Sequence, residues 1–189
     1  MEATDAVAVK LARAGDQDAF RVLVERHSRS VFKLAYRVTG SESDAEDVVQ
    51  ETFLRAWRQL ARFEERSSFG TWVYRVAVNC ALDQLRRRPV REISATPLGD
   101  DEPRIDEEAA ADETWGPDRQ AEATELRRRV HEALNELSPA ERTAFVLRHF
   151  EGRSIDEIGQ AMGLRTSATK HSIFRAVQKM RRTLEPLVG

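Results

Sequence analysis

The sequence has little of several residue types that mark particular kinds of protein. It has one cysteine, Cys80, which excludes an intramolecular disulfide and a multi-cysteine zinc site. Its four histidines show no ligand spacing with one another or with Cys80, so we predict no metal and no other cofactor. Glycine and proline are sparse, no apolar run approaches the ~20 residues of a membrane span, and the N-terminus lacks the basic and apolar stretches of a secretory signal. We therefore expect a helix-rich, cytoplasmic protein without a membrane span.

Charge is present in quantity but is unevenly distributed along the chain. The formal net charge is −2, yet residues 165–182 contain six Lys or Arg and no acidic residue. Residues 100–113 show the opposite bias, with eight acidic residues and one Arg. Because electrostatic attraction is screened beyond ~8–10 Å in physiological salt, the local sign matters more than the total. The basic C-terminal segment is therefore a candidate contact for nucleic acid.

Apolar residues at helical spacing predict three amphipathic helices in the first half of the chain. These helices are expected at residues 16–36, 43–60 and 68–88. Ser43 and Glu46 have the spacing of a capping box at the start of the second helix, and Pro89 ends the third. Together the helices predict one small bundle over roughly residues 5–90.

The helical pattern disappears after this bundle. From Pro89 to about Asp118 the chain contains four of its six prolines among Asp, Glu, Ala and Thr. Such a segment cannot bury enough apolar surface to offset its ordering entropy, so we interpret it as a flexible acidic linker. The sequence thus predicts an all-α protein with two small helical domains, at residues 1–90 and 119–189, joined by a linker at 91–118.

The C-terminal half has the layout of a helix-turn-helix. Ser138 and Ser154 each offer an N-cap with a Glu three residues later, and Thr166 or Ser167 caps a last, basic helix. Between the last two helices, Gly159 stands where a second helix would cross and Gly163 stands in the turn. A plain helical hairpin is the alternative, but the uninterrupted positive charge of the last helix favours insertion into the major groove of DNA.

A second constellation interleaves aromatic rings with Arg and Asn between residues 62 and 88. Unstacked bases regain ~1–3 kcal/mol by stacking on aromatic rings, so this pattern is typical of single-stranded DNA contact. Phe69, Trp72 and Val76 share one apolar face and are expected mainly in the core. Tyr74, Arg75 and Asn79 fall off that face and are the better candidates for DNA contact.

A third constellation is the acidic edge of the helix predicted at residues 43–60. Its members are Asp44, Asp47, Gln50, Glu51 and Leu54. A solvated helix face would explain the acids, whereas Leu54 beside them is the one hint of a protein partner.

At three places the sequence resembles the extracytoplasmic-function (ECF) sigma factors. Residues 44–57 resemble the family's region 2 helix that binds polymerase, and residues 69–88 resemble its promoter-melting segment. Residues 137–142 and 150–159 resemble its region 4. The resemblance implies a transcription initiation factor with no catalytic residue. It also implies three partners: core RNA polymerase, through the clamp helices of its largest subunit and the flap of the second subunit; promoter DNA; and an anti-sigma factor.

The resemblance also implies roles for particular residues. The acidic edge, Asp44, Asp47, Gln50, Glu51 and Leu54, would bind core polymerase. The minus-10 element would be contacted by Phe63, Ser67, Ser68, Trp72, Tyr74, Arg75, Asn79 and Arg86. The minus-35 element would be contacted by Arg165, Ser167, Lys170, His171, Phe174 and Arg175.

The sequence departs from the family pattern in two places. Residues 64–66 are Glu-Glu-Arg where the family often has Arg-Gly-acid, so the loop that would pocket an extruded base is expected to differ in preference. His171 and Ser172 replace a frequent Ser-Arg pair in the recognition helix. The alternative function is a helix-turn-helix regulator that binds duplex DNA without being a polymerase subunit.

Overall fold

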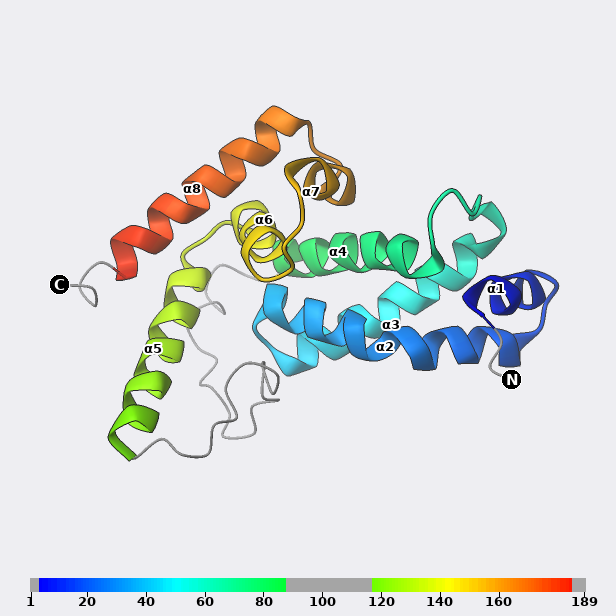
Figure 1. The fold of residues 1–189 in the computed structure, drawn as a ribbon, viewed down its shortest axis with the longest axis horizontal. Coiled ribbons are helices and arrows are strands. Elements are labelled where there is room, and N and C mark those ends of the chain that lie inside the picture. The colour runs from blue at the N-terminus through cyan, green and yellow to red at the C-terminus, as the bar shows by residue number, and fades with distance from the viewer. Residues whose placement is uncertain (1–3, 88–116, 185–189) are drawn as a thin grey trace.

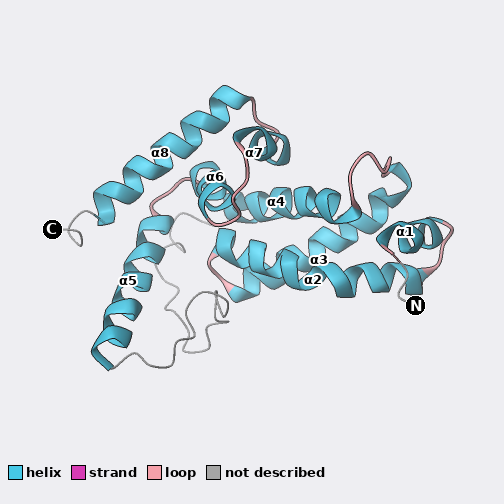
Figure 2. Cartoon of the chain, viewed as in Figure 1, coloured by secondary structure: helices cyan, strands magenta, loops and turns pink. Residues whose placement is uncertain are grey.

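The computed structural model describes residues 4–87 and 117–184, which are helical with no strand (Figure 2). This agrees with the all-α prediction. The predicted acidic linker at 91–118 lies almost wholly outside the described residues, and α5 begins at Pro117, within the predicted linker.

The first half of the chain forms an N-terminal bundle (Figure 1). Its elements are α1 (Asp5–Arg13), α2 (Gln17–Thr39), α3 (Glu42–Gln59), the 3-10 turn η1 (Leu60–Arg62) and α4 (Phe69–Arg87). The helices α2, α3 and α4 pack against one another, and α1 packs mainly on α2. Fully buried Leu23, Leu34, Val48 and Val73 lie at the centre of this bundle.

Two local details differ from the sequence-based expectations. Helix α1 was not separately predicted, although Ala8, Val9 and Ala12 have the spacing of a buried helical stripe and are buried. Helix α3 begins at Glu42, one residue earlier than expected, because its N-cap is Ser41, whose hydroxyl accepts a hydrogen bond from the backbone N–H of Asp44. The predicted capping role of Ser43 is therefore wrong.

The second half of the described chain forms a C-terminal helical group. It comprises α5 (Pro117–Asn135), α6 (Pro139–His149), α7 (Ile155–Met162) and α8 (Thr166–Leu184). The predicted capping boxes at Ser138 and Ser154 are confirmed, with reciprocal hydrogen bonds to Glu141 and Glu157. Helix α8 begins at Thr166 and includes Ser167, so both residues that were expected to cap it lie within the helix.

Helices α7 and α8 form the predicted helix-turn-helix. Gly163 takes the left-handed conformation at φ +66°, which ends α7. A Cβ at Gly159 would lie 2.9 Å from the carbonyl oxygen of Leu164, so only glycine allows the chain to pass this close. The two glycines therefore fix the angle at which α8 leaves α7.

Helices α6 and α7 also pack against the N-terminal bundle, on α4 and the end of α2. Val146, Leu147 and Ile158 belong to one continuous apolar core with residues of α4. Helix α8 lies on the outer side of α6 and α7, away from α4 (Figure 1). A smaller core joins α8 to α5 through Ala133, Leu134, Leu137, Ala176 and Met180.

Candidate functional site

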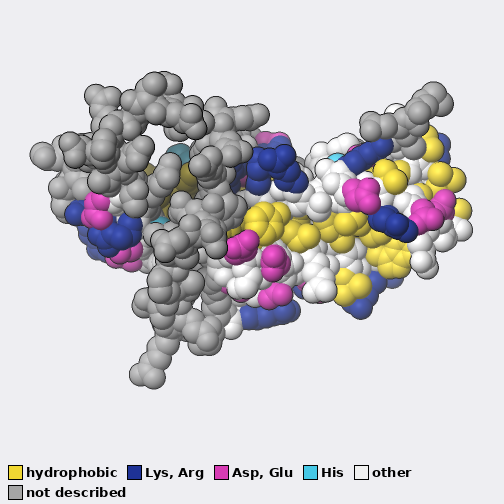
Figure 3. All heavy atoms as spheres, turned by 90° about the horizontal axis from the view of Figure 1, so that it is seen from below, with side chains coloured by type: hydrophobic (Ala, Val, Ile, Leu, Met, Phe, Trp, Pro, Cys, Tyr) yellow, Lys and Arg dark blue, Asp and Glu magenta, His cyan; other side chains and the backbone are white. Residues whose placement is uncertain are grey.

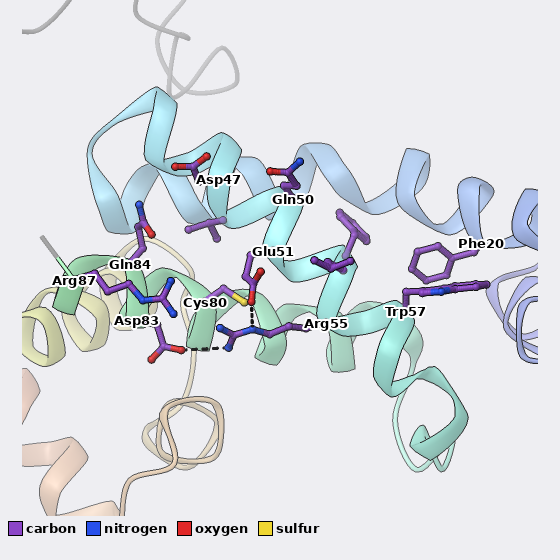
Figure 4. A pocket seen from close by; sticks show the side chains of 13 residues that line it. Phe20, Asp47, Gln50, Glu51, Arg55, Trp57, Cys80, Asp83, Gln84 and Arg87 are labelled. Carbon is purple, nitrogen blue, oxygen red and sulfur yellow. Dashed lines mark hydrogen bonds and ion pairs between the residues drawn. The ribbon is translucent and has the colours of Figure 1, made fainter.

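A groove of about 580 Å³ lies between α3 and α4, with one residue from α2 (Figure 4). It is lined by Phe20, Asp47, Val48, Gln50, Glu51, Phe53, Leu54, Arg55, Trp57, Cys80, Asp83, Gln84 and Arg87. Four of the five residues of the predicted acidic edge are therefore brought together in one concave surface. We call this surface the α3/α4 groove.

Arg55 neutralises part of the acidic lining. Its Nε lies 2.6 Å from Oε1 of Glu51, and its Nη1 lies 3.2 Å from Oδ2 of Asp83 (Figure 4). The Glu51 hydrogen bond raises the pKa of Arg55, with Asp83 contributing in the same direction, so the guanidinium is charged at every relevant pH. Asp47 and Gln50 remain exposed on the rim. The groove thus presents an exposed acid and an amide around a fixed ion-pair network.

One end of the groove is apolar. The rings of Phe20 and Trp57 meet edge to face, with centroids 4.8 Å apart, and Leu54 lies one helical turn before Trp57 with 42% of its surface exposed. Apolar side chains form a band along the N-terminal bundle, with acidic side chains beside it (Figure 3). Exposed apolar side chains rimmed by polar ones are typical of protein-interaction surfaces.

Asp44 stands apart from the other acids of this edge. It is half-buried, its Oδ1 accepts a hydrogen bond of 2.9 Å from Nε2 of Gln84, and it does not line the groove. Its predicted contact with polymerase stays a prediction, but the structure gives it a role in joining α3 to α4. Sequence reasoning missed Phe20, Asp83 and Arg87, because nothing in their own helices distinguishes them from other surface residues.

The segment that precedes α4 is built on an aromatic cluster. Phe63, which was expected to contact DNA, is buried, and its ring centroid lies 5.0 Å from that of Trp72 and 6.1 Å from that of Phe69. A buried ring cannot stack on a base unless the loop rearranges. Phe63 therefore supports the loop from within, together with the ring of Trp72.

Polar residues of this segment remain available on its outside. Ser68 caps α4 by accepting a hydrogen bond of 3.1 Å from the backbone N–H of Thr71, and Ser67 is half-exposed. Glu65 takes a left-handed conformation at φ 55°, which turns the loop sharply before α4. Residues 64–68 therefore form a short projecting loop, with a sharp turn, just before α4.

Four of the predicted minus-10 residues of α4 differ in exposure. Asn79 is exposed and donates from Nδ2 to the carbonyl oxygen of Arg75 at 2.8 Å, while Arg75 itself is half-buried. Arg86 is exposed and lies 3.8 Å from Asp83. Tyr74 is covered, because the guanidinium of Arg153, from the loop between α6 and α7, lies over its ring at 4.5 Å from the centroid.

The predicted minus-35 residues gather on the outer face of α8. Ser167, Lys170, His171, Phe174 and Arg175 are all exposed, as is Arg165 just before the helix. Phe174 is the most exposed large apolar side chain of the described residues, at 58%. Ala176 and Met180 form the opposite, buried face, which packs on α5 and α6. His171 lies near the centre of the exposed face, and half-buried Ser172 lies at its flank.

This exposed face contains no acidic residue, so its charge suits a phosphate backbone.

Within residues 4–87 and 117–184, no three His, Cys, Asp or Glu side chains converge as a metal site would require. Within the same ranges no helix is long and apolar enough to cross a bilayer.

The two halves of the chain match two family models. The Sigma-70 region 2 model matches residues 23–89, and the Sigma-70 region 4 model matches residues 127–180. Among curated proteins, the chain is 34% identical to the ECF RNA polymerase sigma-E factor of Escherichia coli strain K12, over 98% of this chain and 96% of the relative. It is 32% identical to the RNA polymerase sigma-H factor of Pseudomonas aeruginosa, over 95% and 93%.

Solved structures give the same likeness. The structure of CnrH in complex with the cytosolic domain of CnrY is 28% identical, with a TM-score of 0.62 over 96% of this chain and 97% of that chain. The sigma factor RpoE of Bartonella quintana, solved with the anti-sigma factor NepR, is 21% identical with a TM-score of 0.58 over 88% and 96%, and is similar in fold.

Proposed function

Because this chain belongs to the extracytoplasmic-function (ECF) RNA polymerase sigma factors, we propose that three of its surfaces divide the work of initiation. As a sigma factor it directs RNA polymerase to promoters. In our proposal, the α3/α4 groove binds core polymerase, the loop and outer face of α4 bind the minus-10 element, and the exposed face of α8 binds the minus-35 element. The chemistry of transcription would belong wholly to the core enzyme.

The α3/α4 groove is the observation that carries this proposal. It places exposed Leu54 and Trp57 toward one end and Asp47 with the Glu51–Arg55 pair along the rest, which gives an apolar patch beside charged groups. Protein interfaces commonly have this anatomy, because apolar burial supplies affinity and complementary charge selects the partner. The fitting partner is a helical surface with basic residues beside apolar ones, and we assign that role to the clamp helices of the largest polymerase subunit.

The minus-10 assignment rests on the projection before α4. We propose that Ser67, Ser68 and Asn79 line the place of an unpaired base, with Arg75 and Arg86 toward the phosphates. Phe63 and Trp72 would hold the loop in shape, since both rings belong to the aromatic cluster. The side-chain amide of Asn79 is the one best placed to read a base edge, because it is exposed and its Nδ2 donates to a carbonyl oxygen of its own helix.

The minus-35 assignment rests on the exposed face of α8. Residues in the first turns of a recognition helix reach base edges, whereas later ones run toward the backbone. We propose base contacts for Ser167 and His171, and contacts with the sugar-phosphate backbone for Lys170 and Arg175. Exposed Phe174 would make an apolar contact, of the kind that thymine methyl groups offer.

Two further protein partners are proposed. Phe150 is exposed at the end of α6, where Phe145 lies beside it with a centroid distance of 6.2 Å, and this apolar patch is a candidate contact for the flap of the second polymerase subunit. CnrH was solved with the cytosolic domain of another protein, CnrY. By analogy we propose that an anti-sigma factor binds this chain.

The test is promoter-directed transcription with purified core polymerase. Promoters selected from a genomic library should be transcribed only when both this chain and core enzyme are present. Reversal of the groove charge by Asp47→Lys should reduce transcription through weaker core binding, and the thermal melting temperature should be unchanged. A chain that binds duplex promoter DNA alone and never stimulates core polymerase would instead support a helix-turn-helix regulator.

A further inference from the structure

We propose that α6 and α7 dock on the N-terminal bundle as an intramolecular cover for Tyr74, and that this docking must open before Tyr74 can reach promoter DNA. The docking itself is argued from contacts within the chain. Its consequence for DNA rests on the proposed function of Tyr74. The two parts can therefore fail separately.

The docked surface is a continuous piece of core. Val146, Leu147 and Ile158 of α6 and α7 are fully buried, and they pack in one cluster with Val73 and Val78 of α4. Removing apolar side chains of this size from water is favourable. The two halves of the chain therefore share a buried apolar core at this contact.

Polar partners fix the edge of this surface. Arg37 near the end of α2 forms an ion pair with Glu151 in the loop between α6 and α7, and their side chains are only 21% and 17% exposed. Two residues later in that loop, Arg153 covers the Tyr74 ring. A poorly solvated ion pair fixes how the two halves align, because separating Arg37 from Glu151 would leave each charge without its partner.

A glycine allows the closest approach between the two halves. Gly40 ends α2 at φ +69°, and a Cβ at this position would overlap Nη2 of Arg142 and lie 2.7 Å from Cε1 of His131. Arg142 has little room to withdraw, since it is buried and its Nη1 donates to Oδ1 of Asn135 at 2.6 Å. A methyl group at Gly40 would therefore push α5 and α6 away from the bundle.

Tyr74 is the residue whose accessibility depends on this docking. Burial raises the pKa of its phenol to about 12, and Glu151 acts in the same direction, so the docked arrangement favours a neutral, covered ring. Its neighbour Asn79, on the same helix, is exposed. Docking thus covers one part of the predicted minus-10 surface and leaves another part open.

Gly40→Ala in the full chain tests the docking, with Gly163→Ala as its matched control. Both glycines are left-handed helix caps, at φ +69° and +66°, so alanine adds the same backbone strain at each. A Cβ at Gly163 meets nothing within 4 Å. We expect Gly40→Ala, but not Gly163→Ala, to raise the radius of gyration in small-angle X-ray scattering and to speed nitration of Tyr74 by tetranitromethane.

A charge reversal gives a second route that does not change the backbone. Arg37→Glu should open the chain by the same two measurements, and adding Glu151→Arg should close it again. An unchanged radius of gyration and unchanged nitration in both Gly40→Ala and Arg37→Glu would overturn the docking. Equal opening by Gly163→Ala would overturn it as well, because strain alone would then explain the effect.

The consequence for DNA is measured with a short, fluorescent, single-stranded oligonucleotide of random sequence. If docking hides Tyr74, Gly40→Ala should bind this probe roughly tenfold more tightly than the wild type, since a closed population reduces the apparent affinity. Adding Tyr74→Ala should remove the gain. If the chain opens and the gain survives Tyr74→Ala, the assignment of Tyr74 to DNA is wrong while the docking stands. If it opens with no gain at all, the idea that docking hides a DNA contact is overturned.

Discussion

Truncation of Leu54 to alanine should weaken the binding of core polymerase without a matching loss of fold. Leu54 exposes 42% of its surface at the apolar end of the α3/α4 groove. Burying a whole leucine side chain contributes ~1.5–3 kcal/mol, so covering the exposed part contributes about 1 kcal/mol, or a roughly fivefold change in Kd. The effect would be larger if the position is central to the interface.

The chain offers a matched control for this substitution in Leu11→Ala. Leu11 is also a helical leucine and exposes 46% of its surface, but it lies on α1 and does not line the groove. Because the two leucines are buried to nearly the same extent within the chain, their truncation should destabilise folding by similar amounts. A difference between the variants then reports on the partner.

The assay is equilibrium binding of the labelled full chain to purified core polymerase, with thermal melting of each variant alongside. We expect a roughly fivefold higher Kd for Leu54→Ala and no change for Leu11→Ala. Wild-type affinity in Leu54→Ala would refute the placement of core polymerase in the groove. An equal loss in both variants would indicate a general folding defect instead.

Other predictions concern DNA and pH. Asn79→Ala should slow open-complex formation, measured by permanganate footprinting, more than it weakens initial promoter binding, measured by filter binding. Equal losses in both steps would indicate a general defect in folding or in promoter binding. Lys170→Ala should weaken duplex binding at all sequences and lower its salt dependence by about one ion if it contacts phosphate, and an unchanged salt slope would place it elsewhere. Ser172→Arg should shift one base of the minus-35 preference in a selected promoter library, and identical preferences would contradict this. NMR of labelled tyrosine should show a pKa of about 12 for Tyr74, above the ordinary tyrosine pKa of 10. Because the docked arrangement covers the neutral phenol, it is stable below pH 10 and loosens as the pH rises toward 12. A measured pKa near 10 would mean that the ring is uncovered.

Helix boundaries and caps could largely be predicted from the sequence, because they depend on neighbours close along the chain. The capping boxes at Ser138 and Ser154 need only a Glu three residues later, and both are present. The capping prediction at Ser43 was wrong because Ser41 offers a competing hydroxyl two residues earlier. The exposed, basic face of α8 could also be predicted, since helical periodicity and the lack of acids are visible in the sequence itself.

Only the tertiary structure decided which of these helical faces meet. The sequence placed Asp47, Glu51 and Leu54 on one helix edge, but the packing of α4 beside α3 made that edge a groove and added Asp83. The sequence also placed Tyr74 off the apolar face of α4, where it should have been free. Arg37 and Glu151 are 114 residues apart, and no local pattern announces that they pair. Such contacts depend on how whole helices pack, so they are decided by the apolar surface that the complete fold buries and not by any short segment of the chain.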